Sequence, residues 1–187
     1  MVSLRRDDVI AGLRQLVREL HDRGAHATIR IVGGAAIMLR YFEDRRITPD
    51  VDASISTDTD LDEIVRSISA EHGWPTDWLN TAAAGFIPFA GDDHWEAIHD
   101  DDTVSVWVAT PPCLLAMKLK AARRGRDDDD VAVLLAYLDI DSADEAEAVF
   151  ESQYPGELPP PRAYDMLEDI LRVGVPDVRR PPAVDLR

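Results

Sequence analysis

The stretch from Thr28 to Ile55 reads TIRIVGGAAIMLRYFEDRRITPDVDASI, and it predicts the centre of the fold. Its first five residues are mostly β-branched, which favours a strand. Gly33-Gly34 then predicts a turn, and the apolar residues 35–42 predict a helix. A second strand-like run carries Asp50 and Asp52. The stretch therefore predicts a strand, a glycine turn, a helix and a strand bearing two carboxylates.

Asp50 and Asp52 are two positions apart on the predicted second strand. Side chains alternate along a strand, so both face one way, about 7 Å apart, and can converge on a divalent cation, Mg²⁺ or Mn²⁺. Gly33 and Gly34 begin a helix, where free backbone N–H groups and the helix dipole favour an anion. Together they predict a nucleoside triphosphate (NTP) site, with Arg46 and Thr48 as possible phosphate contacts. A tight turn and an exposed strand face explain the same residues without a ligand.

A second polar stretch follows at residues 114–131, LLAMKLKAARRGRDDDDV. Pro111-Pro112 predicts the start of a helix that continues to about Arg124. Lys118 lies in its apolar part, where it either extends its charged end to water or faces a triphosphate. The acidic run at 127–130 is typical of the first turn of a further helix, expected over residues 131–139.

Taken together, the two stretches resemble the nucleotidyltransferase superfold, and in particular the AbiEii/MenT-type toxins of bacterial toxin–antitoxin systems. The resemblance rests on GG followed by R-x-T-x-D-x-D, and on the later K-L-x-A-x-R run with R-D-x-x-D. It implies an α+β fold, a small mixed sheet backed by helices with a C-terminal helical extension. It also implies catalytic roles for Lys118, Asp127 and Asp130 beside the two metal-binding carboxylates. Many relatives carry a third metal-binding carboxylate, for which Glu96 is the first candidate here and Asp102 a poorer one.

The reaction implied is transfer of a nucleoside monophosphate from an NTP to a hydroxyl, with Lys118 neutralising the leaving pyrophosphate. The resemblance implies that the acceptor is the 3′ end of tRNA, that the reaction inhibits translation, and that a cognate antitoxin is a partner. A protein acceptor, a small-molecule acceptor of the aminoglycoside type, and an inactive binding or antitoxin module remain alternatives.

Composition limits the remaining function classes. The 187 residues are 45% hydrophobic and 30% charged, as in globular domains, and a single cysteine, Cys113, excludes an internal disulfide framework. The sequence shows neither a membrane-spanning run nor a signal peptide, so a cytoplasmic protein is expected. The net charge of −16 restricts any RNA to local basic patches. The candidate RNA-binding residues form two clusters along the chain: Arg40, Arg45 and Arg46, and Arg123, Arg124 and Arg126.

The rest of the chain predicts supporting elements. Apolar spacing predicts helices over residues 5–23, 58–72, 143–153 and 162–173, and alternation predicts a strand over 103–109. The expected organisation is a nucleotidyltransferase core over residues 1–110 and a helical part over 111–187. His21 and His26 are interpreted as solvated polar residues. The Pro- and Arg-rich segment 175–187 is expected to be loosely ordered.

Overall fold

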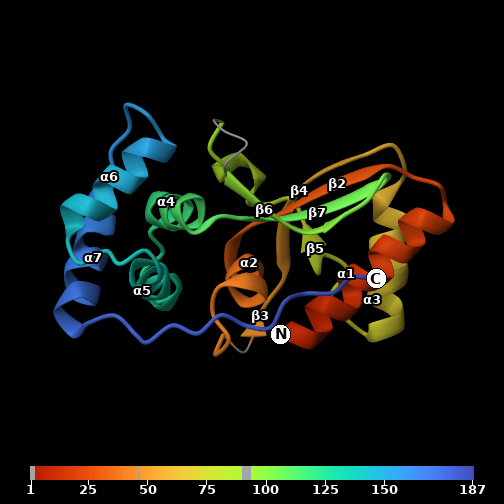
Figure 1. Cartoon of the computed structure of the whole chain (residues 1–187), viewed down its shortest axis with the longest axis horizontal. Coiled ribbons are helices and arrows are strands. Elements are labelled where there is room, and N and C mark those ends of the chain that lie inside the picture. Colours follow the sequence, from red (N-terminus) through yellow and green to blue (C-terminus); the bar gives the residue numbers. More distant parts are fainter. Residues whose placement is uncertain (1–2, 46, 90–93) are drawn as a thin grey trace. The chain divides into compact units, whose positions relative to one another are not determined.

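The computed structural model describes residues 3–45, 47–89 and 94–187 (Figure 1). The chain divides into two compact units. The first unit contains residues 1–85, 95–109 and 180–187, and the second contains residues 86–94 and 110–179. In the described parts of the chain, each helix is too short or too polar to cross a membrane.

The first unit holds the sheets and three helices. In chain order its elements are β1 (Leu4–Arg5), α1 (Arg6–Asp22), β2 (Ala27–Ile31), α2 (Gly33–Arg40), β3 (Ile47–Thr48), β4 (Val51–Thr57), α3 (Leu61–His72), β5 (Leu79–Asn80), β6 (Trp95–Asp100) and β7 (Val104–Ala109). A 3₁₀ turn, η1 (Ala84–Phe86), lies between β5 and β6. The predicted strand–turn–helix–strand order is confirmed in β2, α2 and β4.

The main sheet has the order β5-β4-β2-β7-β6, and β1 and β3 form a separate antiparallel pair. Strand β2 is antiparallel to β4 and parallel to β7, so the main sheet is mixed, as expected. The register places Ile31 between Ala53 and Val108. Residues at these positions share one face of the sheet, because paired residues in neighbouring strands project to the same side.

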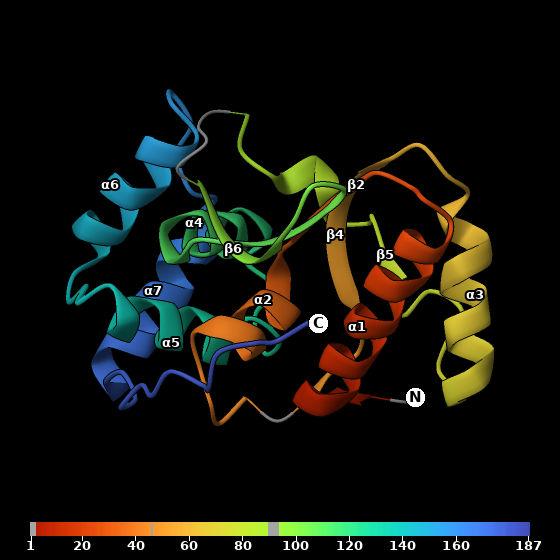
Figure 2. The same cartoon turned by 45° about the vertical axis from the view of Figure 1, so that its right-hand side comes forward.

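One face of this sheet is apolar and the other is polar. Ile29, Ile31, Val106 and Val108 are fully buried, and helices α1 and α2 contact β7 on this side (Figure 1). Helix α3 lies beside α1 rather than between α1 and α2 (Figure 2). On the opposite face, alternation brings up half-buried or exposed side chains: Thr28, Arg30, Asp52, Ser54, Ser56, Ser105 and Trp107. The polar face is therefore the face of the main sheet on which a site with Asp52 would lie.

Helix α1 packs closely against two tryptophans. Its apolar stripe is buried, as the periodicity predicts, and Gly12 also lies on the buried side. A Cβ on Gly12 would lie 2.9 Å from the rings of both Trp74 and Trp78. Trp78 is fully buried and donates its indole N–H to the carbonyl of Val65 on α3. The missing side chain at Gly12 is therefore what admits the tryptophans between α1 and α3.

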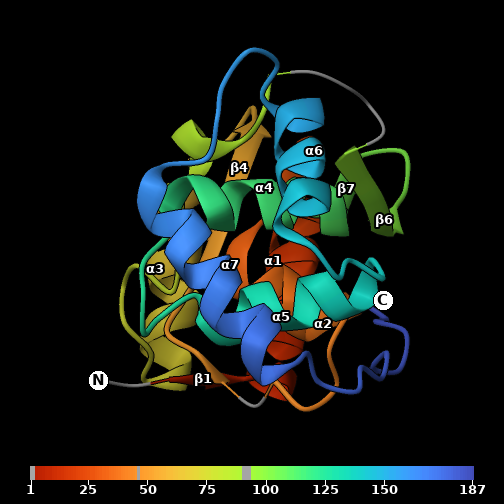
Figure 3. The same cartoon turned by 90° about the vertical axis from the view of Figure 1, so that its left-hand side faces the viewer.

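The second unit is helical, and its elements are α4 (Pro111–Ala121), α5 (Asp128–Tyr137), α6 (Ala143–Gln153) and α7 (Pro161–Val173) (Figure 3). Helix α4 contacts both α5 and α6, and α7 contacts α5 and α6. Helix α4 ends three residues before the expected Arg124, because Ala122 adopts a left-handed backbone with φ of 40°. Helix α5 begins at Asp128, earlier than the expected Val131, so the acidic run forms its first turn.

The C-terminal segment differs from expectation. The residues from Arg180 to Arg187 belong to the first unit, although the sequence predicts a loosely ordered tail. The backbone carbonyls of Pro182 and Asp185 accept hydrogen bonds from Arg6 and Arg14 of α1, at 2.6 and 2.7 Å. Leu186 is almost fully buried. For residues 180–187 the prediction of a loose tail is wrong, because long-range arginine contacts and one apolar anchor hold this part of the segment.

Candidate functional site

The glycine turn lies between β2 and α2. Gly33 has a φ of 65°, a left-handed conformation that glycine adopts without strain. A Cβ at this position would lie 3.3 Å from an Oδ2 atom of Asp52. The backbone N–H of Val32 also donates to the carbonyl of Asp52 at 2.9 Å. The carboxylate of Asp52 therefore lies beside the beginning of α2, where backbone N–H groups lack helical partners.

Asp50 and Asp52 lie at the same end of β4, its first end. Asp52 lies in β4 on the polar face and Asp50 immediately precedes the strand, and both are half-buried. Thr48, which is buried, donates its hydroxyl to the Asp50 carbonyl at 3.0 Å. That bond directs the Thr48 side chain to the backbone between β3 and β4. Thr48 thus supports the local backbone of the carboxylate pair.

Glu96 is excluded as the third carboxylate beside Asp52. It pairs with Val108, which is in register with Ile31 and Ala53 on the apolar face. Asp52 neighbours Ala53 in β4 and therefore projects to the other face. Glu96 instead forms an ion pair with Arg40 at 2.8 Å. Burial, followed by the Glu96 charge, raises the pKa of the Tyr41 hydroxyl.

Arg45 lies against the glycine turn. A Cβ on Gly34 would overlap one of its guanidinium nitrogens, so the guanidinium of Arg45 lies directly against this glycine. The sequence analysis predicts that Arg45 binds RNA. In the structure Arg45 lies next to the candidate phosphate site. Arg46 falls outside the described residues.

Lys118 lies in a buried ion-pair network of the second unit. Its Nζ atom is 2.7 Å from Asp127 Oδ1 and 2.8 Å from Asp130 Oδ2. All three residues are buried, and they link α4 to the first turn of α5. From the sequence, two positions are predicted for the Lys118 amine: in water, or in contact with a triphosphate. In the structure the Lys118 amine is buried and forms ion pairs with two carboxylates, so it does not extend into bulk water.

Asp127 is the centre of this network. Its carboxylate also accepts from Arg123, from Nε at 2.8 Å and from the backbone N–H at 3.2 Å. Burial alone would raise the pKa of Asp127, but the hydrogen bonds from Arg123 and the charge of Lys118 outweigh it. The pKa of Asp127 is therefore held below its ordinary value, and its carboxylate is charged at neutral pH.

The second arginine cluster is partly neutralised by its own unit. Arg123 is paired with Asp127, and Arg124 is paired with Asp169 of α7. Arg126 is exposed. In the first cluster, Arg40 is paired with Glu96. These pairs reduce the positive charge that the arginines offer to an RNA backbone.

The predicted residues thus form two groups, each within its own unit. Gly33, Gly34, Arg45 and Asp52 come together at the start of α2, and Lys118, Arg123, Asp127 and Asp130 meet between α4 and α5. Sequence reasoning missed a third group, in which His21 contacts Asp101. The spacing of His99 and Asp101, two residues apart, was the available signal, but His21 is distant in the chain.

Comparison with known families assigns the chain. The sequence model of a family described as "Nucleotidyltransferase of unknown function (DUF6036)" matches residues 9–154, a range that contains both groups of predicted residues. Neither a curated protein nor a solved structure matches the chain. With more than three quarters of its length matched, the chain belongs to the DUF6036 family of nucleotidyltransferases.

Proposed function

We propose that this protein transfers a nucleoside monophosphate from an NTP to a hydroxyl group in a reaction that depends on a divalent cation. The observation that carries the proposal is the position of Asp52. Its carboxylate lies beside Gly33 at the beginning of α2, and Asp50 lies two residues before Asp52, immediately ahead of β4. A cation-binding carboxylate and an anion-binding helix start are thereby adjacent, as a metal–triphosphate complex requires.

The residues fit a hard divalent cation such as Mg²⁺ or Mn²⁺. Asp50 and Asp52 offer carboxylate oxygens from one end of β4, and both are accessible enough to exchange water for a cation. A bound cation would supply positive charge to the triphosphate and would make the attacking hydroxyl more acidic. Asp50 and Asp52 would be the residues of this chain that hold the cation.

The glycine turn and Arg45 serve the phosphates in this proposal. The first backbone N–H groups of α2, at Gly33 and Gly34, have no helical carbonyl to donate to, and the positive end of the helix dipole favours an anion there. The guanidinium of Arg45, packed on Gly34, adds a planar donor to the same position. In the reaction the acceptor hydroxyl attacks the α-phosphorus, the bond to the β-phosphate oxygen breaks, and pyrophosphate leaves. Lys118 stays the predicted partner of that pyrophosphate.

The acceptor is the finer part of the proposal. The 3′ end of tRNA, translation inhibition and an antitoxin partner follow from the resemblance to AbiEii/MenT-type toxins. Arg40, Arg123 and Arg124 form ion pairs, so they offer less positive charge to RNA. An RNA acceptor is therefore less well supported than the transfer step. Protein and small-molecule acceptors, and an inactive binding module, are therefore separate outcomes of the test.

The test uses the full chain with each α-labelled NTP, Mg²⁺ and three acceptor pools: total RNA, lysate protein and small hydroxyl compounds. Label in one pool identifies the acceptor class, and chelation of the cation should abolish it. D52N should lower the rate at least about 100-fold, since it removes a metal ligand. D58N is the matched control, because exposed Asp58 follows the other end of β4 and should retain full activity.

Two results would contradict the proposal. Transfer that D52N leaves unchanged would remove Asp52 from the site, and transfer in the presence of excess chelator would remove the cation. An absence of label in all pools with all four NTPs would favour the inactive binding module.

A further inference from the structure

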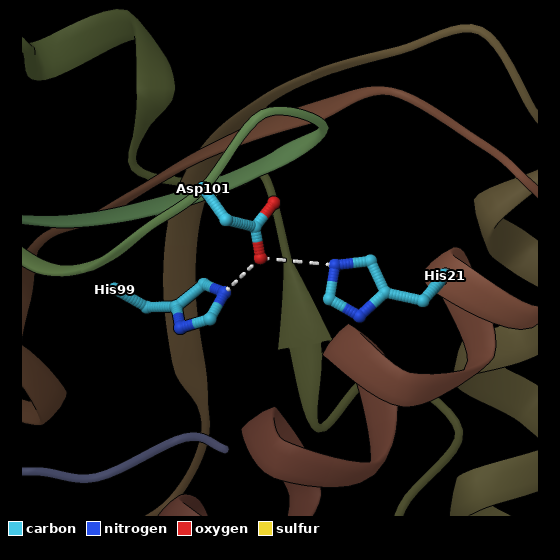
Figure 4. Close-up of side chains that lie close together, drawn as sticks. All are labelled: His21, His99 and Asp101. Carbon is cyan, nitrogen blue, oxygen red and sulfur yellow. Dashed lines mark hydrogen bonds and ion pairs between the residues drawn. The ribbon is translucent and has the colours of Figure 1, made fainter.

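Two histidines and an aspartate meet at one end of the first unit, away from the glycine turn in the sequence. His21 lies in the last turn of α1, His99 lies in β6, and Asp101 lies in the turn between β6 and β7. Figure 4 shows both imidazole rings directed at one carboxylate oxygen of Asp101. Asp101 Oδ2 is 3.0 Å from His21 Nε2 and 2.8 Å from His99 Nε2. One ligand atom from each residue lies within 4.8 Å of the others.

A β-bulge brings His99 to this side of the sheet. Ala97 pairs with Trp107, but two residues later His99 pairs with Val106, so the register shifts by one residue between them. Val106 belongs to the apolar face, which α1 covers. With regular pairing His99 would instead stand opposite Ser105, on the polar face. The bulge therefore turns His99 toward α1 and His21, in the way that bulges redirect side chains at functional sites.

The carboxylate of Asp101 is oriented by the turn in which it lies. Its Oδ1 atom accepts from the backbone N–H groups of Thr103 and Val104, at 2.9 and 2.8 Å, and from the Thr103 hydroxyl at 3.1 Å. These bonds occupy Oδ1 and leave Oδ2 directed at the imidazoles. An aspartate carboxylate is ordinarily anionic at neutral pH, as a ligand to a divalent cation must be.

An adjacent cavity gives the cluster access to solvent. Its volume is about 740 Å³, and it is lined by all three residues and by further residues of the first unit. Asp100 and Asp185 add negative charge to the wall, whereas Arg18 and Arg187 add positive charge. His21 and Asp101 have side chains 39% and 34% exposed, and that of His99 is only 10% exposed. A small ligand can therefore reach the cluster, while His99 remains anchored in the sheet.

We propose that His21, His99 and Asp101 bind a divalent transition-metal ion, Zn²⁺ in the first instance, with a fourth coordination position open to the cavity. Two imidazole nitrogens and one carboxylate oxygen are a ligand set that suits zinc with an open position. In a tetrahedral zinc site, ligand atoms lie about 3.3 Å apart, so the observed spacing requires adjustments of about 1 Å. The second oxygen of Asp101, bonded to the turn, provides the outer-shell support that such ligands have.

A bound ion would join three segments. It would tie the C-terminal end of α1 to β6 and to the β6–β7 turn, and binding only to the folded chain stabilises that state by mass action. The alternative is a hydrogen-bond network without an ion, in which each imidazole donates its Nε2–H to Asp101. This proposal does not depend on nucleotidyl transfer, because the cluster shares no residue with the glycine turn, Asp50 or Asp52.

The experiment titrates metal-free, tag-free full-length protein with Zn²⁺ by calorimetry, and with Co²⁺ by absorption spectroscopy. We expect one Zn²⁺ per chain, a tetrahedral-type Co²⁺ spectrum and a rise in Tm with Zn²⁺. H21A and H99A should each weaken binding more than about 100-fold, beyond the 10–100-fold typical of lost outer-shell partners. H26A is the matched control, because His26 also contacts an aspartate, Asp58 at 3.3 Å, but has no second histidine grouped with it among the described residues.

The outcomes separate the two explanations. Saturable binding of one ion that H21A and H99A remove and H26A retains supports the site. Absent binding, or binding that H21A leaves unchanged, overturns it and leaves the hydrogen-bond network. Should H99A fail to fold, exposed His21 carries the test alone, with circular dichroism verifying that H21A is folded.

Discussion

Asp127 illustrates how a single residue combines burial with charge. Its side chain is fully buried and contacts Lys118 and Arg123, which together hold its carboxylate in the ionised form. Removing one member of a buried ion pair leaves the others without a counter-charge, which typically costs 3–5 kcal/mol. Asp127 is therefore a residue of stability as well as a predicted residue of the catalytic site.

We predict that D127N lowers the free energy of unfolding by about 3 kcal/mol at pH 7, measured by urea denaturation. D129N is the matched control, because Asp129 lies in the same first turn of α5 but is exposed. Its substitution should change stability by less than about 0.5 kcal/mol. Equal effects of the two substitutions would show that the network contributes no stability of its own.

The pH dependence of stability should follow from the same residue. The pKa of Asp127 is lower in the folded chain than in the unfolded chain, where it is about 3.9. Its stabilisation is thus fully present well above the unfolded-state pKa and is lost progressively as the pH falls from about 5 through the lower, folded-state pKa. On acidification, the free energy of unfolding of the wild type should fall more steeply with pH than that of D127N. Parallel curves for the two proteins would contradict the assignment.

At the scale of elements, the contact between α1 and the tryptophans depends on one missing side chain. Gly12 lies in the buried stripe of α1, and a Cβ there would overlap the rings of Trp74 and Trp78 at 2.9 Å. Trp78 cannot move freely, because it is fully buried and its N–H is bonded to Val65. The packing of α1 on α3 should therefore be sensitive to a single methyl group.

We predict that G12A destabilises the protein by about 1–3 kcal/mol through overpacking, although alanine favours helix by about 1 kcal/mol over glycine. The measurement is the urea midpoint at constant slope. G85A is the matched control, since a Cβ at Gly85 meets no atom within 4 Å among the described residues. A G12A protein as stable as G85A would show that the tryptophans adjust without loss.

At the scale of the whole molecule, the net charge of −16 limits how the protein can bind RNA. Phosphate contacts dominate affinity for nucleic acid and make it salt-dependent, so RNA must be held by a few cationic groups. Arg40, Arg123 and Arg124 already have acidic partners, whereas Arg126 is exposed at the beginning of the acidic run. Arg126 is thus the informative position for an RNA acceptor.

With tRNA as the acceptor, R126E should raise the KM for tRNA several-fold and reduce the salt dependence of log K by about one contact, while leaving the KM for NTP unchanged. R66E is the matched control, because Arg66 is an exposed arginine of α3 outside both basic clusters. Transfer that is insensitive to salt and to R126E would move the acceptor to a protein or a small molecule.

The sequence by itself determined the order and type of most elements. Local periodicity predicts α1 over residues 5–23, observed at 6–22, and β7 over 103–109, observed at 104–109. Alternation likewise predicts the polar orientation of Asp52, and a glycine pair predicts the turn before α2. These features depend on neighbours in the chain, so local sequence is sufficient to predict them. The mixed α+β fold and the nucleotidyltransferase family follow from the same local signals.

The tertiary structure alone decided which distant residues meet. Glu96 is a plausible third carboxylate by spacing, but strand register directs it to the face opposite Asp52. The tail that composition predicts as loose is held by two arginines of α1, more than 160 residues away in the chain. His21 meets His99 because a bulge shifts the register by one residue, which reverses the face of every later side chain in that strand. Strand pairing and bulges are set by packing over the whole sheet, and no local pattern in the sequence encodes them.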